Sequence, residues 1–226
     1  MNLPSLLVTD FAGTTLRDDG AVVSAYRRVL SARAIPFSEA DLNARRGASK
    51  RAVFEDFAAR VASDPQTIRQ LAAQALTDFE AALRREYEQG DLHEIDGAQD
   101  AIAALRNADV RVALSSGFER GLVEAMLARL GWQTLFDTVV AADDVPVGRP
   151  APFLIYRAMM ELEVLDVARV AVVGDTTLDL RSAANARAGW AIGVLSGAHD
   201  LATLGSETHT HLLPSVAALP ALFGLE

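Results

Sequence analysis

Short apolar runs alternate with helical patterns along most of the chain. Apolar runs that end at polar or glycine residues predict strands buried on both faces of a sheet. Such runs occupy residues 6–9, 110–114, 138–141, 170–173 and 191–195. Apolar residues recur with helical spacing between them, over residues 97–107, 119–131, 151–163 and 179–188. This order predicts an α/β fold, with a parallel sheet covered by helices on both faces.

The stretch from residue 11 to residue 96 interrupts that alternation. It shows no convincing strand, and helical spacing of apolar residues occupies 21–34, 50–62 and 65–87. The simplest interpretation is an all-helical insertion after the first strand. We therefore expect residues 1–16 and 97–226 to form the core and residues 17–96 to form a helical cap.

Composition narrows the function classes. The chain has 226 residues, 50% of them hydrophobic and 23% charged, which is typical of a globular protein. The formal charge of −9 argues against a nucleic-acid partner, and the absence of cysteine excludes disulfides, thiolate nucleophiles and zinc-thiolate sites. No apolar stretch is long enough for a membrane span and no signal peptide is evident, so we expect a cytoplasmic protein without a membrane partner.

Polar residues follow three of the predicted strands at their carboxyl ends, where open parallel sheets bind ligands. These residues are Asp10, Ser116, Gly117 and Asp175, with Asp179 one helical turn beyond Asp175. Carboxylates from two strands suit a hard, oxygen-preferring cation such as Mg²⁺. The Ser116 side chain and the Gly117 N–H, at the start of a helix, are suited to phosphate oxygens.

Arg149 adds a cation in a turn stiffened by Pro146, Pro150 and Pro152. Each of these residues also has an ordinary interpretation: the aspartates as helix N-caps, Ser116 as a turn residue and Arg149 as a surface cation. Their joint occurrence at matching strand ends favours a binding site.

Lys50 stands out among the basic residues. Of the 21 Lys and Arg residues it is the one lysine, and the other 20 are arginine. Arginine keeps its proton at accessible pH, whereas a lysine amine can become a nucleophile. The alternative is an arginine-biased composition that leaves one surface lysine. For nucleophilic attack near neutral pH, burial and neighbouring arginines would have to depress the pKa of Lys50 below about 10.4.

Four motifs in this order resemble those of the haloacid dehalogenase superfamily. They are the loop from Asp10 to Thr15, then Ser116, Arg149 and the loop from Gly174 to Asp179. The resemblance implies a Rossmann-like parallel-sheet core with an all-helical cap inserted after strand 1. It also implies that Asp10 attacks phosphorus to form an aspartyl-phosphate. In this resemblance Mg²⁺ is held by Asp10, the Ala12 carbonyl and Asp175, with Asp179 supporting.

We expect the substrate and its phosphoryl group to be bound by Ala12, Gly13, Arg46, Gly47, Ser116, Gly117 and Arg149. Two positions depart from the usual superfamily pattern. Most members carry a second Asp two residues after the nucleophile, where this chain has Ala12, and a Lys where it has Arg149. An alkoxide leaving group needs the proton that this second Asp supplies, so Ala12 argues against an ordinary phosphate-ester hydrolase.

A subset of motifs resembles the phosphonatase family and the phosphonatase-like hydrolases. These motifs are Asp-x-Ala-Gly-Thr from Asp10, Gly-x-x-Lys from Gly47 to Lys50, and the segment from Gly148 to Pro152. The resemblance implies that Lys50 forms a Schiff base with an aldehyde or ketone β to phosphorus. Cleavage of the C–P bond then leaves an enamine in place of a carbanion. The expected substrate is phosphonoacetaldehyde or a related 2-oxoalkylphosphonate.

The match is incomplete at two cap positions. Phosphonatases carry Met before the cap glycine and His three residues after the lysine, where this chain has Arg46 and Val53. Lys50 must therefore find another proton relay, and Arg45 or Arg46 could meet an additional anionic group on the substrate.

Two other functions compete with C–P hydrolysis. One is a Mg²⁺-dependent phosphomonoesterase of the same fold in which Lys50 only binds substrate, and the other is a receiver-like signalling module phosphorylated on Asp10. The helical insertion favours an enzyme with a lid over a small substrate. The sequence leaves the oligomeric state open, with a homodimer as one option.

Overall fold

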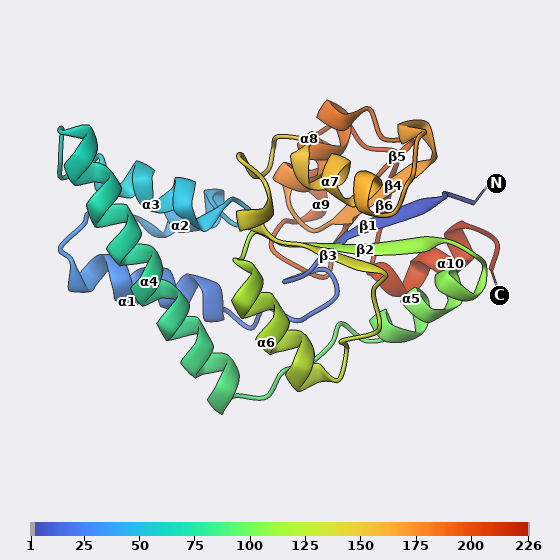
Figure 1. The fold of residues 1–226 in the computed structure, drawn as a ribbon, viewed down its shortest axis with the longest axis horizontal. Coiled ribbons are helices and arrows are strands. Elements are labelled where there is room, and N and C mark those ends of the chain that lie inside the picture. The colour runs from blue at the N-terminus through green and yellow to red at the C-terminus, as the bar shows by residue number, and fades with distance from the viewer. Residues whose placement is uncertain (1–2, 226) are drawn as a thin grey trace. The chain divides into compact units, whose positions relative to one another are not determined.

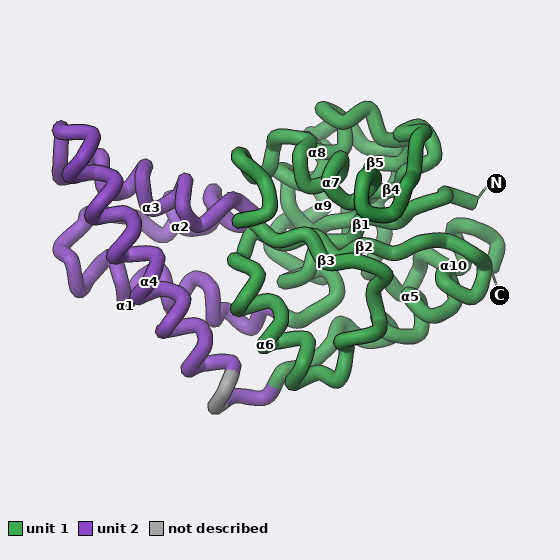
Figure 2. Tube along the Cα trace, in the orientation of Figure 1, with its two compact units in different colours: residues 1–17, 92–226 green, residues 18–91 purple. Residues whose placement is uncertain are grey.

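The computed structural model describes residues 3–225, apart from the side chains of residues 88 and 89. The chain forms two compact units, which Figure 2 shows in green and purple. The core unit comprises residues 1–17 and 92–226, and the helical unit comprises residues 18–91. The sequence analysis expected these boundaries at 16/17 and 96/97. Residue 17 and residues 92–96 belong to the core unit in the structure, whereas they were expected in the cap. The two chain segments that lead out of and back into the core unit are hydrogen-bonded to each other, since Arg17 N–H donates to His93 O and Ile95 N–H donates to Thr15 O.

The core unit contains one six-stranded parallel sheet in the order β3-β2-β1-β4-β5-β6 (Figure 1). The strands are β1 (Leu6–Asp10), β2 (Arg111–Ser115), β3 (Thr138–Val140), β4 (Val170–Gly174), β5 (Trp190–Val194) and β6 (His211–Leu213). The parallel, Rossmann-like α/β fold expected from the sequence is confirmed. The first five strands match predicted runs, and β6 was not predicted.

Helices cover both faces of this sheet (Figure 1). The helices of the core unit are α5 (Ala98–Asn107), α6 (Arg120–Leu130), α7 (Phe153–Glu161), α8 (Thr177–Ala186), α9 (Leu201–Gly205) and α10 (Leu219–Leu222). Helices α7, α8 and α9 lie on one face, and α5, α6 and α10 lie on the other. This division follows from right-handed crossovers, since the chain adds strands on one side of β1 first and on the other side later.

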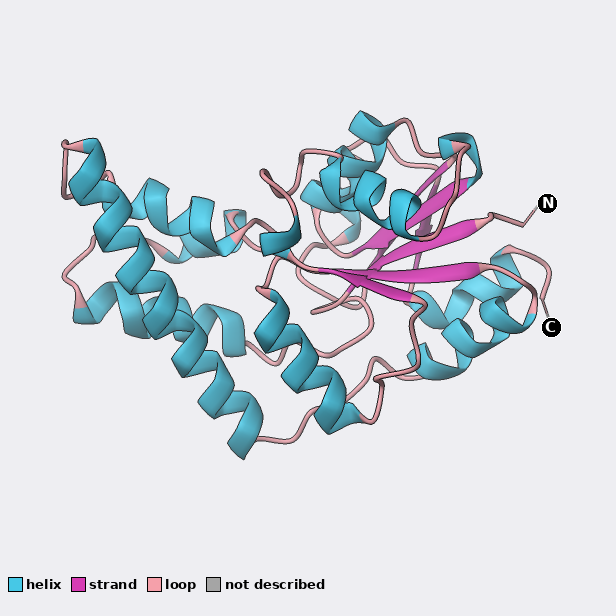
Figure 3. Cartoon of the chain, in the orientation of Figure 1, coloured by secondary structure: helices cyan, strands magenta, loops and turns pink. Residues whose placement is uncertain are grey.

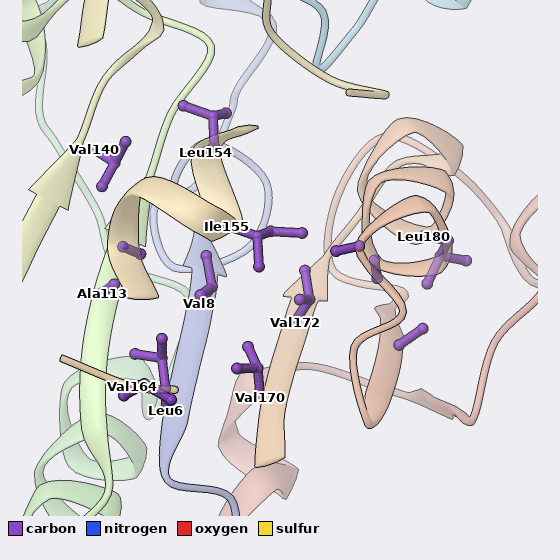
Figure 4. Close-up of a cluster of buried hydrophobic side chains, with 14 of the residues drawn as sticks. Leu6, Val8, Ala113, Val140, Leu154, Ile155, Val164, Val170, Val172 and Leu180 are labelled. Atoms are coloured by element: carbon purple, nitrogen blue, oxygen red, sulfur yellow. The ribbon is translucent and has the colours of Figure 1, made fainter. Parts of the chain in front are cut away.

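The apolar core beneath α7 holds β1 and β4 side by side (Figure 4). Val8 of β1 is paired in register with Val172 of β4, and Ile155 of α7 packs over both strands. These side chains are at most 6% exposed, and each such burial contributes roughly 1.5–3 kcal/mol. This packing fixes the carboxyl ends of β1 and β4 next to each other.

The strand order creates a topological switch point at β1. The chain passes from β1 to β2 on one side of it and returns to β4 on the other. In open α/β sheets, ligands bind outside the carboxyl ends of the strands at such a point. The expected site therefore lies beyond Asp10, Ser115 and Gly174.

The described residues of the helical unit form helices and loops without a strand (Figure 3). Its helices are α1 (Ala21–Ala32), α2 (Glu39–Ala44), α3 (Lys50–Ala58) and α4 (Pro65–Gln89). A trio of fully buried aromatic rings forms its centre, with Tyr26 lying 5.3 Å from Phe54 and 4.6 Å from Phe79 between ring centroids. Helices α1, α3 and α4 were predicted and α2 was missed. Among the described residues, no helix is both long and apolar enough to span a membrane.

Candidate active site

Asp10 ends β1 and leads into a tight loop. The N–H groups of Thr15 and Leu16 both donate to Phe11 O at 2.9 Å, and the Thr15 hydroxyl donates to Asp10 O at 3.2 Å. Gly13 turns the loop with a φ of +96°, where its N–H donates to Leu16 O. A Cβ at this position would collide with the carboxylate of Asp175, so only glycine permits this approach.

Asp175 and Asp179 enter the site from the link between β4 and α8. Thr14 Oγ1 donates to Asp175 Oδ1 at 3.1 Å, and Ala198 N–H donates to Asp175 Oδ2 at 2.6 Å. The Asp179 carboxylate closes a capping box, accepting hydrogen bonds from the N–H and hydroxyl of Thr176 at 3.1 and 2.6 Å. Thr176 is the N-cap of α8 and Asp179 stands at the third helical position, so the interpretation of Asp179 as an N-cap is wrong. Its second oxygen points to another partner.

That partner is Arg149. Its Nη1 lies 2.6 Å from Asp10 Oδ1 and 2.6 Å from Asp179 Oδ1, and its Nη2 donates to Ser115 O at 3.1 Å. Only 3% of the side chain is exposed, so the interpretation as a surface cation is wrong. The following turn is tied to α8, because Asn185 donates to Pro150 O at 2.8 Å. Arg149 thus joins three elements distant in sequence.

The electrostatics of this cluster are those of buried carboxylates around one cation. Burial, together with the charges of Asp10 and Asp179, raises the pKa of Asp175 to about 8. Burial also raises the pKa of Asp179 to about 6, against the lowering effect of Arg149. Burial lowers the pKa of Arg149, but the carboxylates of Asp10 and Asp179 outweigh it and raise that pKa overall. A second cation here would relieve the remaining repulsion.

The donor set fits a magnesium ion. Asp10, Asp175 and Asp179 are all buried, and one carboxylate oxygen from each lies within 4.8 Å of the others. Hard divalent cations prefer such oxygens, and Mg²⁺ is held by one or two carboxylates together with water and substrate phosphate. Each carboxylate also has partners in the protein: Asp10 pairs with Arg149, and Asp175 accepts hydrogen bonds on both oxygens. Asp179 pairs with both Thr176 and Arg149.

Ser116 and Gly117 follow β2, beside β1 in the sheet. The Ser116 N–H continues the sheet by donating to Val140 O at 3.0 Å, and its hydroxyl oxygen accepts from Phe118 N–H at 3.0 Å. The hydroxyl hydrogen can therefore be donated to a ligand. Helix α6 begins at Arg120 with Glu119 as its N-cap. Ser116 and Gly117 thus precede the helix instead of starting it.

The helical unit contains Lys50 and the other cap residues singled out from the sequence. Lys50 is the first residue of α3 and is 5% exposed, with Nζ donating to Ala48 O at 3.1 Å. The surface-lysine interpretation is wrong. Gly47 turns the preceding loop with a φ of +77°, and Arg46 pairs with Asp18 at 2.7 Å. An anionic group on the substrate would have to compete with Asp18 for Arg46.

One part of the core-unit site, the loop after β5, was not identified from the sequence. The loop after β5 contacts the cluster, since Ser196 Oγ donates to Gly13 O at 2.9 Å and Ala198 N–H donates to Asp175. His199 in the same loop accepts a hydrogen bond on Nδ1 from Thr177 N–H at 3.1 Å. The available signal was the position of this loop at the carboxyl end of a predicted strand.

Comparisons with known proteins identify a family match and several similar proteins. Residues 4–187 match the haloacid dehalogenase-like hydrolase family. A phosphonoacetaldehyde hydrolase of Bacillus cereus strain B4264 is 33% identical over 117 residues, covering 51% of this chain and 44% of the relative. The phosphonoacetaldehyde hydrolase of Syntrophobacter fumaroxidans is 36% identical over 116 residues, covering 50% and 41%. The matched part of the chain thus spans less than half the length of these relatives.

Solved structures agree on the fold. A hydrolase from Pseudomonas syringae has a TM-score of 0.85 at 19% identity, covering 98% of this chain and 99% of the other. A phosphonoacetaldehyde hydrolase-like protein from Oleispira antarctica has a TM-score of 0.84 at 21% identity, covering 99% and 92%. A Lactobacillus plantarum protein, provisionally assigned as a phosphoglycolate phosphatase, has a TM-score of 0.81 at 17% identity, covering 98% and 100%. At these identities the similarity establishes the fold alone.

The family match spans most of the chain, including β1, the helical unit, β2, Arg149, β4 and α8. It therefore contains every residue of the carboxylate cluster. The parallel sheet, its helical insertion after β1 and the similar solved structures agree with that match. The chain belongs to the haloacid dehalogenase-like hydrolases.

Proposed function

We propose that this hydrolase cleaves the C–P bond of phosphonoacetaldehyde or a related 2-oxoalkylphosphonate and releases phosphate. The observation that carries the proposal is the burial of Lys50, the one lysine of the chain. Lysine is among the residues least often buried, and its charge is costly away from water. A buried primary amine at a fixed position is suited to condense with a carbonyl group.

Ala12 supports the same substrate class. It occupies the position two residues after Asp10 and has no acid to protonate a departing alkoxide. A carbon leaving group stabilised as an enamine needs no proton at the moment of cleavage. The phosphonoacetaldehyde hydrolases among its relatives are consistent with this preference.

The reaction would begin at Lys50. Its neutral amine adds to the carbonyl carbon of the substrate, and the resulting carbinolamine takes up one proton and loses one water, which leaves an iminium in which Nζ keeps one hydrogen. An Asp10 carboxylate oxygen then attacks phosphorus as the C–P bond breaks. The bonding pair moves into the new carbon–carbon double bond, and the C=N pair moves onto nitrogen, giving a neutral enamine and an aspartyl-phosphate.

Two waters complete the turnover. Protonation of the enamine carbon regenerates an iminium, and one water hydrolyses it to the dephosphonylated aldehyde or ketone and free Lys50. A second water hydrolyses the aspartyl-phosphate to phosphate and Asp10. The balance is one substrate and one net water consumed. Asp10 belongs to the core unit and Lys50 to the helical unit.

The remaining residues would bind the phosphoryl group. Asp10, Asp175 and the Ala12 carbonyl would hold Mg²⁺, with Asp179 in support. When bound, this ion would neutralise charge on the phosphoryl oxygens. Arg149 would orient Asp10, and the Ser116 hydroxyl and the Gly117 N–H would donate to phosphoryl oxygens. Gly13 would act through its backbone conformation, since its N–H is already bonded to Leu16 O.

The decisive assay measures phosphate release from phosphonoacetaldehyde, 2-oxopropylphosphonate and common phosphate esters. We expect an oxoalkylphosphonate to be the best substrate, with activity that requires Mg²⁺ and disappears in Asp10→Asn. Borohydride added during turnover should reduce the iminium to a secondary amine, which peptide mass locates on Lys50. Lys50→Arg keeps the charge, cannot condense, and should yield neither adduct nor C–P cleavage.

Two results would overturn the proposal. An adduct found only on the terminal amine, or full C–P cleavage by Lys50→Arg, would remove the Schiff base. Ester hydrolysis as fast as the best phosphonate reaction would instead identify a phosphomonoesterase.

A further inference from the structure

The face of the Tyr26 ring meets Lys50 within the helical unit. Nζ of Lys50 lies over this ring, 5.8 Å from its centroid. Tyr26 is fully buried between Phe54 and Phe79, so its ring is fixed by packing on other aromatic side chains. A ring held in this way presents the negative face of its quadrupole to a cation within about 6 Å.

The chemistry of the amine gives this contact a function. Burial disfavours a positive charge on Lys50, yet the iminium of the proposed reaction must stay cationic to accept the electron pair of the C–P bond. An iminium retains one N–H, and Ala48 O already accepts a hydrogen bond from Nζ at 3.1 Å. The Ala48 carbonyl can therefore accept the single N–H of the iminium, and the face of the Tyr26 ring can stabilise its positive charge.

The Tyr26 hydroxyl does not explain the choice of residue. It is buried and has no hydrogen-bond partner among the residues that the structure describes. Burial raises the pKa of this phenol well above its usual range, so it stays neutral. The ring itself is therefore the feature of Tyr26 that meets the amine.

We propose that Tyr26 is a positioning residue whose ring face, together with the Ala48 carbonyl, stabilises positive charge on the nitrogen of Lys50 once the iminium has formed. This inference rests on the proposed function for its place in the reaction, but the underlying contact can be tested without a phosphonate. The Tyr26 ring would also provide a cation-stabilising group in the unit where Val53 stands in place of the phosphonatase histidine.

Competitive acetylation with trace acetic anhydride measures the reactivity of Lys50 against pH, with the terminal amine as internal reference. Loss of the ring in Tyr26→Leu should move the midpoint of the Lys50 curve down by about one pH unit, a tenfold change. Borohydride trapping of an acetaldehyde iminium on Lys50 should fall by about tenfold. Tyr26→Phe keeps the ring and should restore both values.

Phe79→Leu is the matched control, because it removes a ring of the same buried trio that contacts Tyr26. It should lower stability as Tyr26→Leu does, while the Lys50 curve stays in place. If Tyr26→Leu fails to fold, mono-, tri- and pentafluorophenylalanine at position 26 keep the shape and weaken the ring face in steps. The midpoint should then fall with each step.

The inference is overturned if the Lys50 curve is unchanged by Tyr26→Leu or by the fluorinated series, or if Phe79→Leu moves it equally. Failure of the proposed function gives a different pattern. In that case oxoalkylphosphonates leave no adduct on Lys50, while the acetylation curve still responds to Tyr26.

Discussion

Arg149 Nη1 lies 2.6 Å from Asp10 Oδ1, and the two side chains are only 3% and 8% exposed. Removing the guanidinium would leave the carboxylates of Asp10 and Asp179 buried without their shared cation. Arg149→Met should therefore lower the free energy of unfolding by about 3–5 kcal/mol, measured by urea denaturation. Arg149→Lys should cost less, because it keeps a charge.

Arg27→Met is the comparison for this prediction. It breaks the exposed pair between Arg27 and Glu39, and should leave the unfolding curve nearly unchanged. Equal effects of the two methionine substitutions would show that Arg149 does not neutralise the cluster.

Gly13 and Gly20 form a second matched pair. Both have positive φ, at +96° and +89°, but a Cβ on Gly13 meets the Asp175 carboxylate and a Cβ on Gly20 meets nothing within 4 Å. Gly13→Ala should displace Asp175 and weaken Mg²⁺ binding by about 10–100-fold, measured by calorimetry on the intact chain. Gly20→Ala carries similar backbone strain and should bind Mg²⁺ normally. Unchanged binding in both would contradict the role of Gly13.

The pH dependence of stability should report the buried carboxylates. The pKa of Asp175 rises from an ordinary value of 3.8 to about 8 in the folded protein, so between these values the folded state binds more protons than the unfolded state. Stability must then decrease as pH increases. The Tm of the metal-free protein should be lower at pH 9 than at pH 6 by at least about 3 °C.

Mg²⁺ should raise the Tm more at pH 9 than at pH 6, because fewer protons compete for the carboxylate at high pH. Asp175→Asn removes the titrating group and should flatten the pH dependence. A metal-free Tm that rises between pH 6 and pH 9 would show that the carboxylates are not destabilised by burial.

Ala12 gives a prediction about leaving groups. Ala12→Asp places a carboxyl group where most superfamily members carry their general acid, and should raise hydrolysis of nitrophenyl phosphate and sugar phosphates only slightly. The remainder of the site would still be shaped for another substrate. Steady-state kinetics with both substrate classes test this. A large gain in ester hydrolysis would mean that the missing acid alone sets specificity.

Local sequence patterns were sufficient for the central strands. The runs ending at Asp10 and Gly174 are apolar on both faces because β1 and β4 lie inside the sheet, and this burial is visible in the sequence itself. Two elements lacked such a signal. The three residues of β6 are only half-buried, and the six residues of α2 bury Leu42 alone. A short element with few buried side chains leaves no periodic pattern.

The residues at the strand ends and the presence of a single lysine can be read from the sequence. The folded chain was needed to see that Arg149 neutralises Asp10 and Asp179, that the loop after β5 supports Asp175, and that Tyr26 faces Lys50. The difference lies in the range of each interaction. Burial and backbone hydrogen bonding act over a few residues and leave a periodic pattern, whereas Arg149 and Asp10 meet only after distant strands have paired.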